Sequence, residues 1–295
     1  MKTIRNITVL LFALSLSACT GQTKKESKER VITVTIEPQR YFTEAIAGDR
    51  FKVVCMVPQG SSPETYDPTP KQLVSLGESE AYFRIGHIGF EVSWMERLMK
   101  NAPHTQVFDL SKGIEFIHEP GHAHGDHYHV GGVDPHTWNS TINAKIIAGN
   151  IFQALCTLDR ENEPYYLARY NSLVHHIEKT DSTMFHMLKE NEAADHAFMI
   201  YHPALSYFAR DYGLHQICIE EGGKEPSPAH LKELIEIAKF EDVHVIFVQP
   251  EFDRRNAEII ARETGTKIVA INPLSYHWEE EMIRIAKSLT STPHE

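Results

Sequence analysis

From His118 to Trp138 the chain reads H-E-P-G-H-A-H-G-D-H-Y-H-V-G-G-V-D-P-H-T-W, and this stretch lies where a first run of strands and helices ends. Imidazole is the commonest metal ligand in proteins, and short histidine-rich tracts are typical of metal binding. The tract contains several glycines and few apolar residues, so we expect residues 118–132 to form a mobile surface loop. Its candidate metal-binding residues are His118, His122, His124, His127 and His129.

His136 lies in a different setting from these five histidines. Pro135 precedes it and Trp138 follows closely, a combination that predicts a fixed backbone. We therefore interpret His136 as one ordered ligand at the foot of a loose histidine loop. The alternative is a vector-derived tag, but tags lie at chain termini and this tract is internal.

Residues 1–19 have the pattern of a targeting segment. Lys2 and Arg5 give a positive start, and residues 9–16 form an apolar run too short to span a bilayer. The sequence Leu-Ser-Ala-Cys that ends at Cys19 resembles the bacterial lipobox, in which the cysteine is lipidated. We therefore expect an exported protein, lipid-anchored through Cys19 to the bacterial cell envelope on its periplasmic or cell-surface face. An ordinary secretory signal, cleaved near Ala18, is the alternative. Polar residues 20–30 are expected to form a flexible tether.

Composition and charge exclude several classes of protein. The 295 residues are enough for one large or two ordinary domains, and their formal net charge is −11. Nucleic-acid binding is not expected, because it requires a basic patch. Cys55, Cys156 and Cys218 are far apart in sequence, whereas a cysteine zinc site requires closely spaced pairs.

Hydrophobic patterning predicts an α/β fold with two βα-type lobes. Runs rich in β-branched and apolar residues alternate with helical segments, which indicates a mainly parallel four-stranded sheet in each lobe. A helix that Asn162 caps would be about 40 Å long over about 28 residues, enough for one long rigid helix to join both lobes. The predicted parts are an N-terminal metal-binding lobe at 31–158, a linking helix at 159–194 and a C-terminal metal-binding lobe at 195–295.

Polar residues follow four of the predicted strands, and each lies beside a proline. They are Glu64, His202, the segment Gln249–Glu251 and Asn272. Ligands of open α/β sheets bind beyond the carboxyl ends of strands, and binding pockets favour domain interfaces. We therefore expect these residues to converge with His136 on one cleft.

Five motifs together resemble a known family, the ZnuA/TroA-like proteins that supply zinc or manganese to ABC importers. The resemblance extends from about Val31 to the end of the chain. It rests on P-E-T-Y-D-P-T-P at 63–70, D-P-H-T-W at 134–138, Y-H-P-A at 201–204, E-P-S-P at 225–228 and I-N-P-L at 271–274.

The resemblance implies two lobes joined by a long helix, with one metal ion between them. It implies that the metal ligands are the residues at positions 64, 136, 202 and 272, and that the histidine-rich loop marks the zinc branch. The chain departs from the family pattern at Glu64, where most relatives have histidine, and at Asn272, where many have aspartate. Relatives also tend to have Glu-Pro-Gln where this chain has Gln249-Pro250-Glu251.

The chemistry of these residues favours zinc. Two imidazoles and one carboxylate suit Zn²⁺, with water, Asn272 or a loop histidine in a fourth position. The same residues with additional oxygen ligands would suit Mn²⁺. At most sites made of nitrogen and oxygen ligands, however, zinc binds more tightly than manganese. We therefore predict a monomeric solute-binding protein that delivers Zn²⁺ to the membrane permease of an ABC importer.

Three other functions remain open. One is a manganese-binding member of the same family, and another is a surface zinc buffer that transfers metal to other proteins. The third is a zinc-dependent hydrolase, since two histidines and a glutamate also occur in such enzymes. We do not expect an enzyme, because the sequence contains neither H-E-x-x-H nor a nucleophile motif.

Overall fold

The computed structural model describes residues 29–290 apart from residues 119–121, 125–126, 130–131 and 192–193. The predicted targeting segment, with Cys19, and most of the predicted tether therefore lie outside the described residues. In the described part of the chain, no helix is both long enough and apolar enough to cross a membrane.

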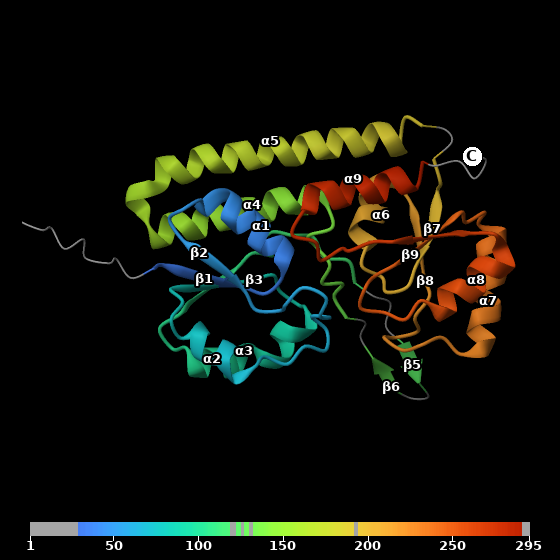
Figure 1. The fold of residues 1–295 in the computed structure, drawn as a ribbon, viewed down its shortest axis with the longest axis horizontal. Coiled ribbons are helices and arrows are strands. Elements are labelled where there is room, and N and C mark those ends of the chain that lie inside the picture. Colours follow the sequence, from blue (N-terminus) through green and yellow to red (C-terminus); the bar gives the residue numbers. More distant parts are fainter. Residues whose placement is uncertain (1–28, 119–121, 125–126, 130–131, 192–193, 291–295) are drawn as a thin grey trace, which may run out of the picture.

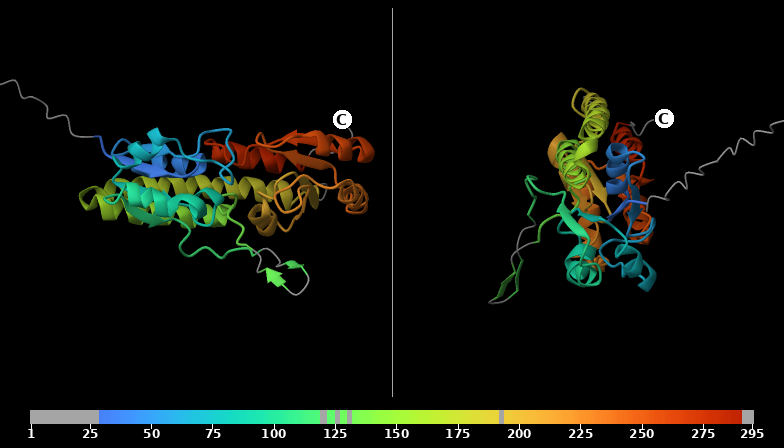
Figure 2. Two further views of the ribbon diagram at one scale, coloured as in Figure 1. Left: turned by 90° about the horizontal axis from the view of Figure 1, so that it is seen from below. Right: turned by 90° about the vertical axis from the view of Figure 1, so that its left-hand side faces the viewer.

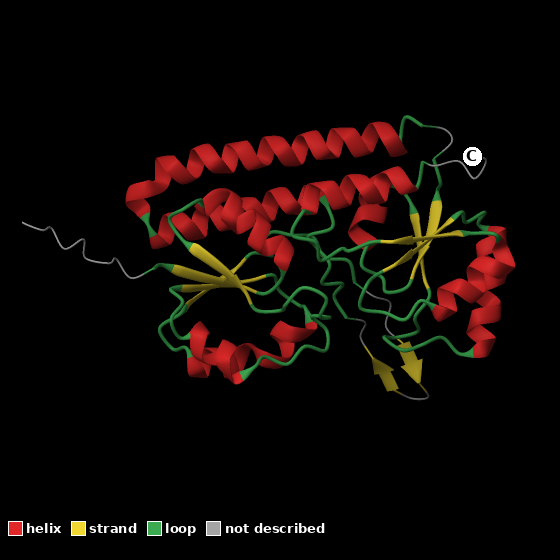
Figure 3. Ribbon diagram, viewed as in Figure 1, coloured by secondary structure: helices red, strands yellow, loops and turns green. Residues whose placement is uncertain are grey.

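The N-terminal lobe is built on four parallel strands in the order β2-β1-β3-β4. Helices cover both faces of this sheet (Figure 3), which is usual for parallel sheets. The strands are β1 (Val31–Val34), β2 (Lys52–Cys55), β3 (Ala81–Arg84) and β4 (Gln106–Asp109), and the helices between them are α1 (Glu37–Ala47), α2 (Pro70–Leu76) and α3 (Gly89–Asn101).

The C-terminal lobe repeats this arrangement with the strand order β10-β9-β7-β8, again all parallel. Every residue of the two central strands β7 and β9 is buried, as expected for apolar strands covered on both faces. The strands are β7 (Ala197–Ile200), β8 (His215–Cys218), β9 (Val245–Val248) and β10 (Lys267–Ala270), and the helices are α6 (Ser206–Tyr212), α7 (Pro228–Phe240), α8 (Arg255–Thr264) and α9 (Trp278–Ser288).

A long helix, α5 (Glu163–Leu188), runs along both lobes (Figure 1), as the sequence predicted. It follows α4 (Thr141–Leu158) and the short 3₁₀ turn η1 (Arg160–Asn162), and it packs against α1 and α4 of one lobe and α9 of the other. Its buried side chains form one stripe that includes Tyr166, Leu173, Ile177, Met184 and Leu188. The α/β class with two four-stranded sheets and one long helix between the lobes is confirmed.

The two lobes share one apolar core. Phe42 of α1 and Trp278 of α9 pack edge to face, with their ring centroids 5.1 Å apart. Both side chains are buried in the cluster that also contains the stripe of α5. This shared core favours small relative movements of the lobes over a wide hinge motion.

The segment that we expected to be a loop contains a two-stranded antiparallel ribbon, β5 (His122–His124) and β6 (His127–His129). The ribbon projects away from the body of the protein (Figure 2). Sequence patterning did not predict these strands, because each has only three residues, which is at the short end for strands.

Candidate metal-binding site

A small cavity lies between the two lobes. The segments that follow β2, β7, β9 and β10 line it, together with the segment just before α4. Its volume is about 30 Å³, enough for one ion or one or two water molecules but not for an organic substrate. The carboxyl ends of strands from both sheets thus meet at this cavity, as the positions of the polar residues predicted.

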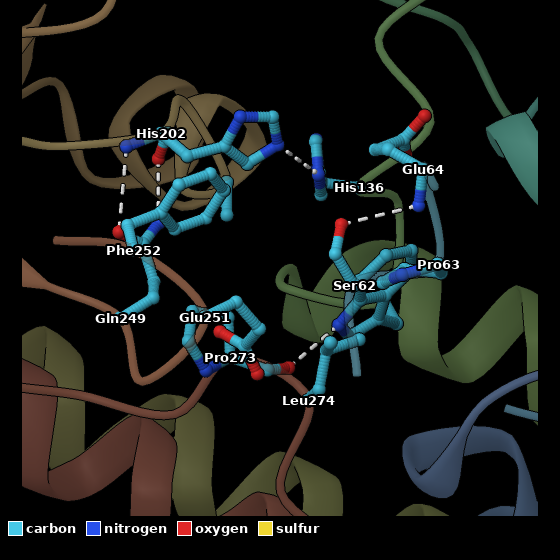
Figure 4. Close-up of a pocket in the computed structure, with 12 residues that line it drawn as sticks. Ser62, Pro63, Glu64, His136, His202, Gln249, Glu251, Phe252, Pro273 and Leu274 are labelled. Atoms are coloured by element: carbon cyan, nitrogen blue, oxygen red, sulfur yellow. Dashed lines mark hydrogen bonds between the residues drawn. The ribbon is translucent and has the colours of Figure 1, made fainter. Parts of the chain in front are cut away.

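Two imidazoles face each other across the cavity. Nε2 of His136 and Nε2 of His202 are 3.2 Å apart (Figure 4). Two ligands of a tetrahedral zinc ion, each with a bond of about 2.0–2.1 Å, stand roughly 3.3–3.4 Å apart. The separation of the two nitrogen atoms is therefore close to that required of two ligands of one ion.

A carboxylate orients each of these imidazoles. Nδ1 of His136 is 2.9 Å from Oδ1 of Asp134, and Nδ1 of His202 is 2.8 Å from Oε1 of Glu220. Each Nδ1–H donates to its carboxylate, which directs the lone pair of each Nε2 into the cavity. Two facing lone pairs repel each other unless a cation lies between them, so the residues present fit a metal ion.

The carboxylate of Asp134 also changes the proton affinity of its partner. Burial by itself lowers the pKa of His136, but the hydrogen bond and the charge of Asp134 outweigh burial and hold that pKa above its ordinary value. Burial likewise tends to raise the pKa of Asp134, whereas its hydrogen bond with His136 holds it below the usual range. Protons therefore compete with metal ions for His136.

The segment that carries His136 is held firmly against the C-terminal lobe. The indole nitrogen of Trp138 donates to the backbone oxygen of Pro273 at 2.8 Å, and the side chain of Asn139 donates to the backbone oxygen of Ala204 at 2.9 Å. The hydroxyl of Tyr207 donates to the backbone oxygen of Asp134 at 2.7 Å. These bonds fix His136 relative to His202, which precedes Ala204 by two residues.

Glu64 reaches the cavity from the loop between β2 and α2. Its Oε2 accepts a hydrogen bond of 3.1 Å from the backbone N–H of Gly89, and the backbone oxygen of Pro63 accepts one of 2.8 Å from Phe90. A Cβ atom at position 89 would lie only 2.4 Å from Oε2 of Glu64, so this contact requires glycine. Glu64 is exposed, and its carboxylate is turned towards Gly89.

Of the four positions predicted to bind the ion between the lobes, Asn272 is the one that does not line the cavity. Its side-chain oxygen accepts from the backbone N–H of Leu274 at 3.1 Å, and its backbone N–H donates to Oε1 of Glu281 at 2.6 Å. It lines a separate depression near residues 57–61. Glu251, which follows β9, lines the cavity instead.

Of the five loop histidines, only His118 has a described side chain, and it does not line the cavity. His118 is exposed and forms an isolated bridge with Val133. The other four belong to β5 and β6, whose register pairs residue 122 with 129 and residue 124 with 127. The residues of the loop at 119–121, 125–126 and 130–131 lie outside the described part.

In the described part of the chain, no three histidine, cysteine, aspartate or glutamate side chains stand close enough together to hold a metal ion. The imidazole pair is therefore in place, while the carboxylates that line the cavity stand farther away. Binding of an ion requires at least one of these carboxylates to move towards the imidazoles.

Sequence reasoning did not assign the orienting carboxylates. Asp134 belongs to the D-P-H-T-W motif, and an acid two residues before a ligand histidine was a usable signal. Glu220 follows β8, and it meets His202 only because β7 and β8 are paired in parallel. That pairing cannot be read from the positions of the two residues in the sequence.

Comparison with known proteins identifies the family. Residues 32–290 match the family model described as ZnuA, zinc-uptake complex component A, periplasmic. The chain therefore belongs to the ZnuA family.

Individual relatives agree with this assignment. The zinc-binding lipoprotein AdcA of Streptococcus pneumoniae is 27% identical over 290 residues, which are 95% of this chain but 57% of that protein. The chain thus spans a little over half the length of AdcA. The metal ABC transporter substrate-binding lipoprotein FimA of Streptococcus parasanguinis is 27% identical, with 92% of this chain and 89% of that protein covered. A crystal structure of ZnuA has a TM-score of 0.82 and 34% identity over 89% of this chain and 98% of that chain.

Proposed function

We propose that this protein is the extracytoplasmic solute-binding component of an ABC metal importer and that it captures Zn²⁺ between its lobes. The observation that carries the proposal is the pair of carboxylate-oriented imidazoles, His136 and His202, which meet Nε2 to Nε2 at 3.2 Å. Glu64 supplies a carboxylate from the other side of the cavity. Membership of the ZnuA family and the zinc-binding name of AdcA support the same function.

Capture and release suit this cavity better than catalysis. A hydrolase needs room for an organic substrate beside its metal ion, whereas about 30 Å³ accommodates little more than the ion itself. An enzyme would be favoured instead if the protein hydrolysed ester or peptide substrates only with added zinc, and if replacement of His136 and His202 abolished this activity.

Zinc is the proposed cargo, and manganese is the alternative. Two imidazole nitrogens favour zinc, which also outranks manganese at most sites of this type. Manganese prefers oxygen ligands, and the carboxylates that line the cavity would supply them. Competition between the two metal ions for the same site separates these alternatives.

The proposed partner is the membrane permease of the importer. Binding of an ion draws the loop of Glu64 towards the imidazole pair, so the metal-bound form presents a slightly different surface to the permease. Only such a difference between the two states gives the ligand a means to control docking. We also propose a monomer that is anchored to the envelope through a lipid at Cys19, which lies outside the described residues.

We further propose that the histidine-rich loop at 118–132 collects zinc weakly before it enters the cavity. The abundance of imidazole in this segment supports the proposal. Deletion of the loop should leave tight zinc binding intact but slow uptake when zinc is scarce. Equal uptake by the deletion variant and the intact protein would refute this role.

The uptake function is tested in cells that carry only a variant protein. His136→Ala together with His202→Ala should abolish growth and uptake of radioactive zinc when a chelator limits the metal. His104→Ala together with His175→Ala is the matched control, because both of these side chains are exposed and do not line the cavity. Normal uptake by the His136 and His202 double variant would refute the proposed function.

A further inference from the structure

We infer that Glu251 is a metal ligand and that it completes the site from the C-terminal lobe in place of Asn272. The site would then offer a divalent cation two imidazole nitrogens and two carboxylates. This inference rests on the proposed capture of a metal ion by His136 and His202.

The backbone around Glu251 is fixed relative to His202. Gln249 is buried, and its side chain brackets the backbone of His202: Oε1 accepts from the N–H at 3.3 Å, and Nε2 donates to the carbonyl oxygen at 2.6 Å. The ring of Phe252 stacks on the imidazole of His202, with centroids 5.1 Å apart and an interplanar angle of 18°. Glu251 lies between these two anchors in the sequence, and Figure 4 shows it beside Pro273 among the residues that line the cavity.

The carboxylate of Glu251 has no competing structural role. It is half-buried and lines the cavity, yet among the described residues no other side chain hydrogen-bonds or ion-pairs with it. The acids that orient the imidazoles differ from it, because Asp134 and Glu220 are each bonded to a histidine. A half-buried carboxylate that is bonded only to its own backbone N–H remains poorly compensated, and a cation in the cavity would stabilise it.

Electrostatics agree with this geometry. Burial raises the pKa of Glu251, while its own backbone N–H and the charge of His202 act in the opposite direction. The largest cause is burial of the charged carboxylate, which a cation in the cavity would offset.

The other polar residues that follow the strands of this lobe are already used. The side-chain oxygen of Asn272 accepts from Leu274, and both ends of the Gln249 amide are bonded to the backbone of His202. Glu64, in the opposite lobe, accepts from Gly89. Glu251 can therefore turn towards an ion without the loss of a side-chain hydrogen bond to another residue, which Glu64 and Asn272 cannot.

The test compares Glu251→Gln with two other variants of the full chain. Glu263→Gln is the matched control, because this residue is exposed on α8 in the same lobe. Asn272→Ala tests the competing ligand. Zinc affinity is measured by competition with a chelator, and Co²⁺ is used as a spectroscopic probe because its visible bands depend on its ligands.

The expected result is that Glu251→Gln weakens zinc binding at least about tenfold, the smallest loss usual even for residues that only support a metal ligand. The Co²⁺ bands should change in the same variant, and Glu251→Asp, which keeps a carboxylate, should recover part of the affinity. The metal-free Glu251→Gln protein should unfold at the temperature of the unmodified protein. Glu263→Gln and Asn272→Ala should leave zinc affinity and the Co²⁺ bands unchanged.

Unchanged affinity and an unchanged Co²⁺ spectrum in Glu251→Gln would overturn the inference. A loss in Asn272→Ala, with no loss in Glu251→Gln, would assign the position to Asn272 instead. Failure of the proposed function is distinguishable, because tight zinc binding would then persist in the His136→Ala and His202→Ala double variant. If tight binding depends on the histidines but not on Glu251, only this inference fails.

Discussion

Replacement of Asp134 by asparagine tests whether the orienting carboxylate sets the affinity for metal. Oδ1 of Asp134 lies 2.9 Å from Nδ1 of His136 and 2.9 Å from its backbone nitrogen. Asparagine keeps an oxygen atom in this position, so the imidazole stays oriented while the negative charge is lost. Loss of such a partner typically weakens metal affinity about 10- to 100-fold, or about 1.4–2.7 kcal/mol.

The effect of this substitution should depend on pH. Asp134 holds the pKa of His136 above its ordinary value, and the metal binds only the deprotonated imidazole. The substitution lowers this pKa, so protons compete less in the variant than in the unmodified protein. The affinity deficit of the variant should therefore be largest near pH 8 and should narrow as the pH falls below the raised pKa of His136.

Calorimetric titration with zinc between pH 5.5 and 8 measures both effects. Asp195→Asn is a matched control, because Asp195 contacts Nδ1 of His244 at 2.8 Å with similar geometry but outside the cavity lining. This control should bind zinc as the unmodified protein does. A deficit below about threefold at pH 8, or one that widens towards acid pH, would refute the role assigned to Asp134.

Three further substitutions give independent tests. Glu64→Gln removes the negative charge that Glu64 would bring to the ion and should weaken zinc binding about tenfold in chelator competition; unchanged affinity would argue against Glu64 as a ligand. Trp138→Phe removes the donor to the buried backbone oxygen of Pro273 and should lower the free energy of unfolding by about 1–3 kcal/mol in urea, so a loss below about 0.5 kcal/mol would contradict this. Burial raises the pKa of Glu91 to about 7, so this carboxyl favours the folded state below its unfolded pKa of about 4.3 and loses that advantage as the pH rises through 7. The free energies of unfolding of Glu91→Gln and the unmodified protein are measured in urea between pH 4.5 and 8. Their difference should change by about 3 kcal/mol in favour of the variant over this range, and a difference that does not change with pH would refute the raised pKa.

Local sequence signals were sufficient to predict the two sheets and the helix between them. Apolar strands such as β9 are short and rich in β-branched residues, and α5 has Pro164 in its first turn and a single buried stripe. Placing His202 directly after a strand was enough to predict its position at the cavity. His136 was found from its motif and its fixed backbone.

The features that the sequence did not predict depend on contacts between distant segments. Glu220 lies 18 residues from His202, and the parallel pairing of β7 and β8 brings the ends of both strands together. Asn272 follows a strand as predicted, but its side chain bonds to the local backbone of its own turn, which is a common competing role of asparagine. The segment Gln249–Glu251 was expected at the cleft, but the sequence did not single out Glu251 as a ligand; that role depends on the hydrogen bonds between the Gln249 side chain and the backbone of His202.

The most direct test of the metal site is a competition titration of the purified, metal-free protein. Zinc and manganese are each added against a chelator of known affinity, and the tight sites for each ion are counted. The account predicts one tight zinc site, much weaker manganese binding, and loss of the tight site when His136 and His202 are both replaced by alanine. A tight site that survives this double replacement, or manganese bound as tightly as zinc, would contradict it.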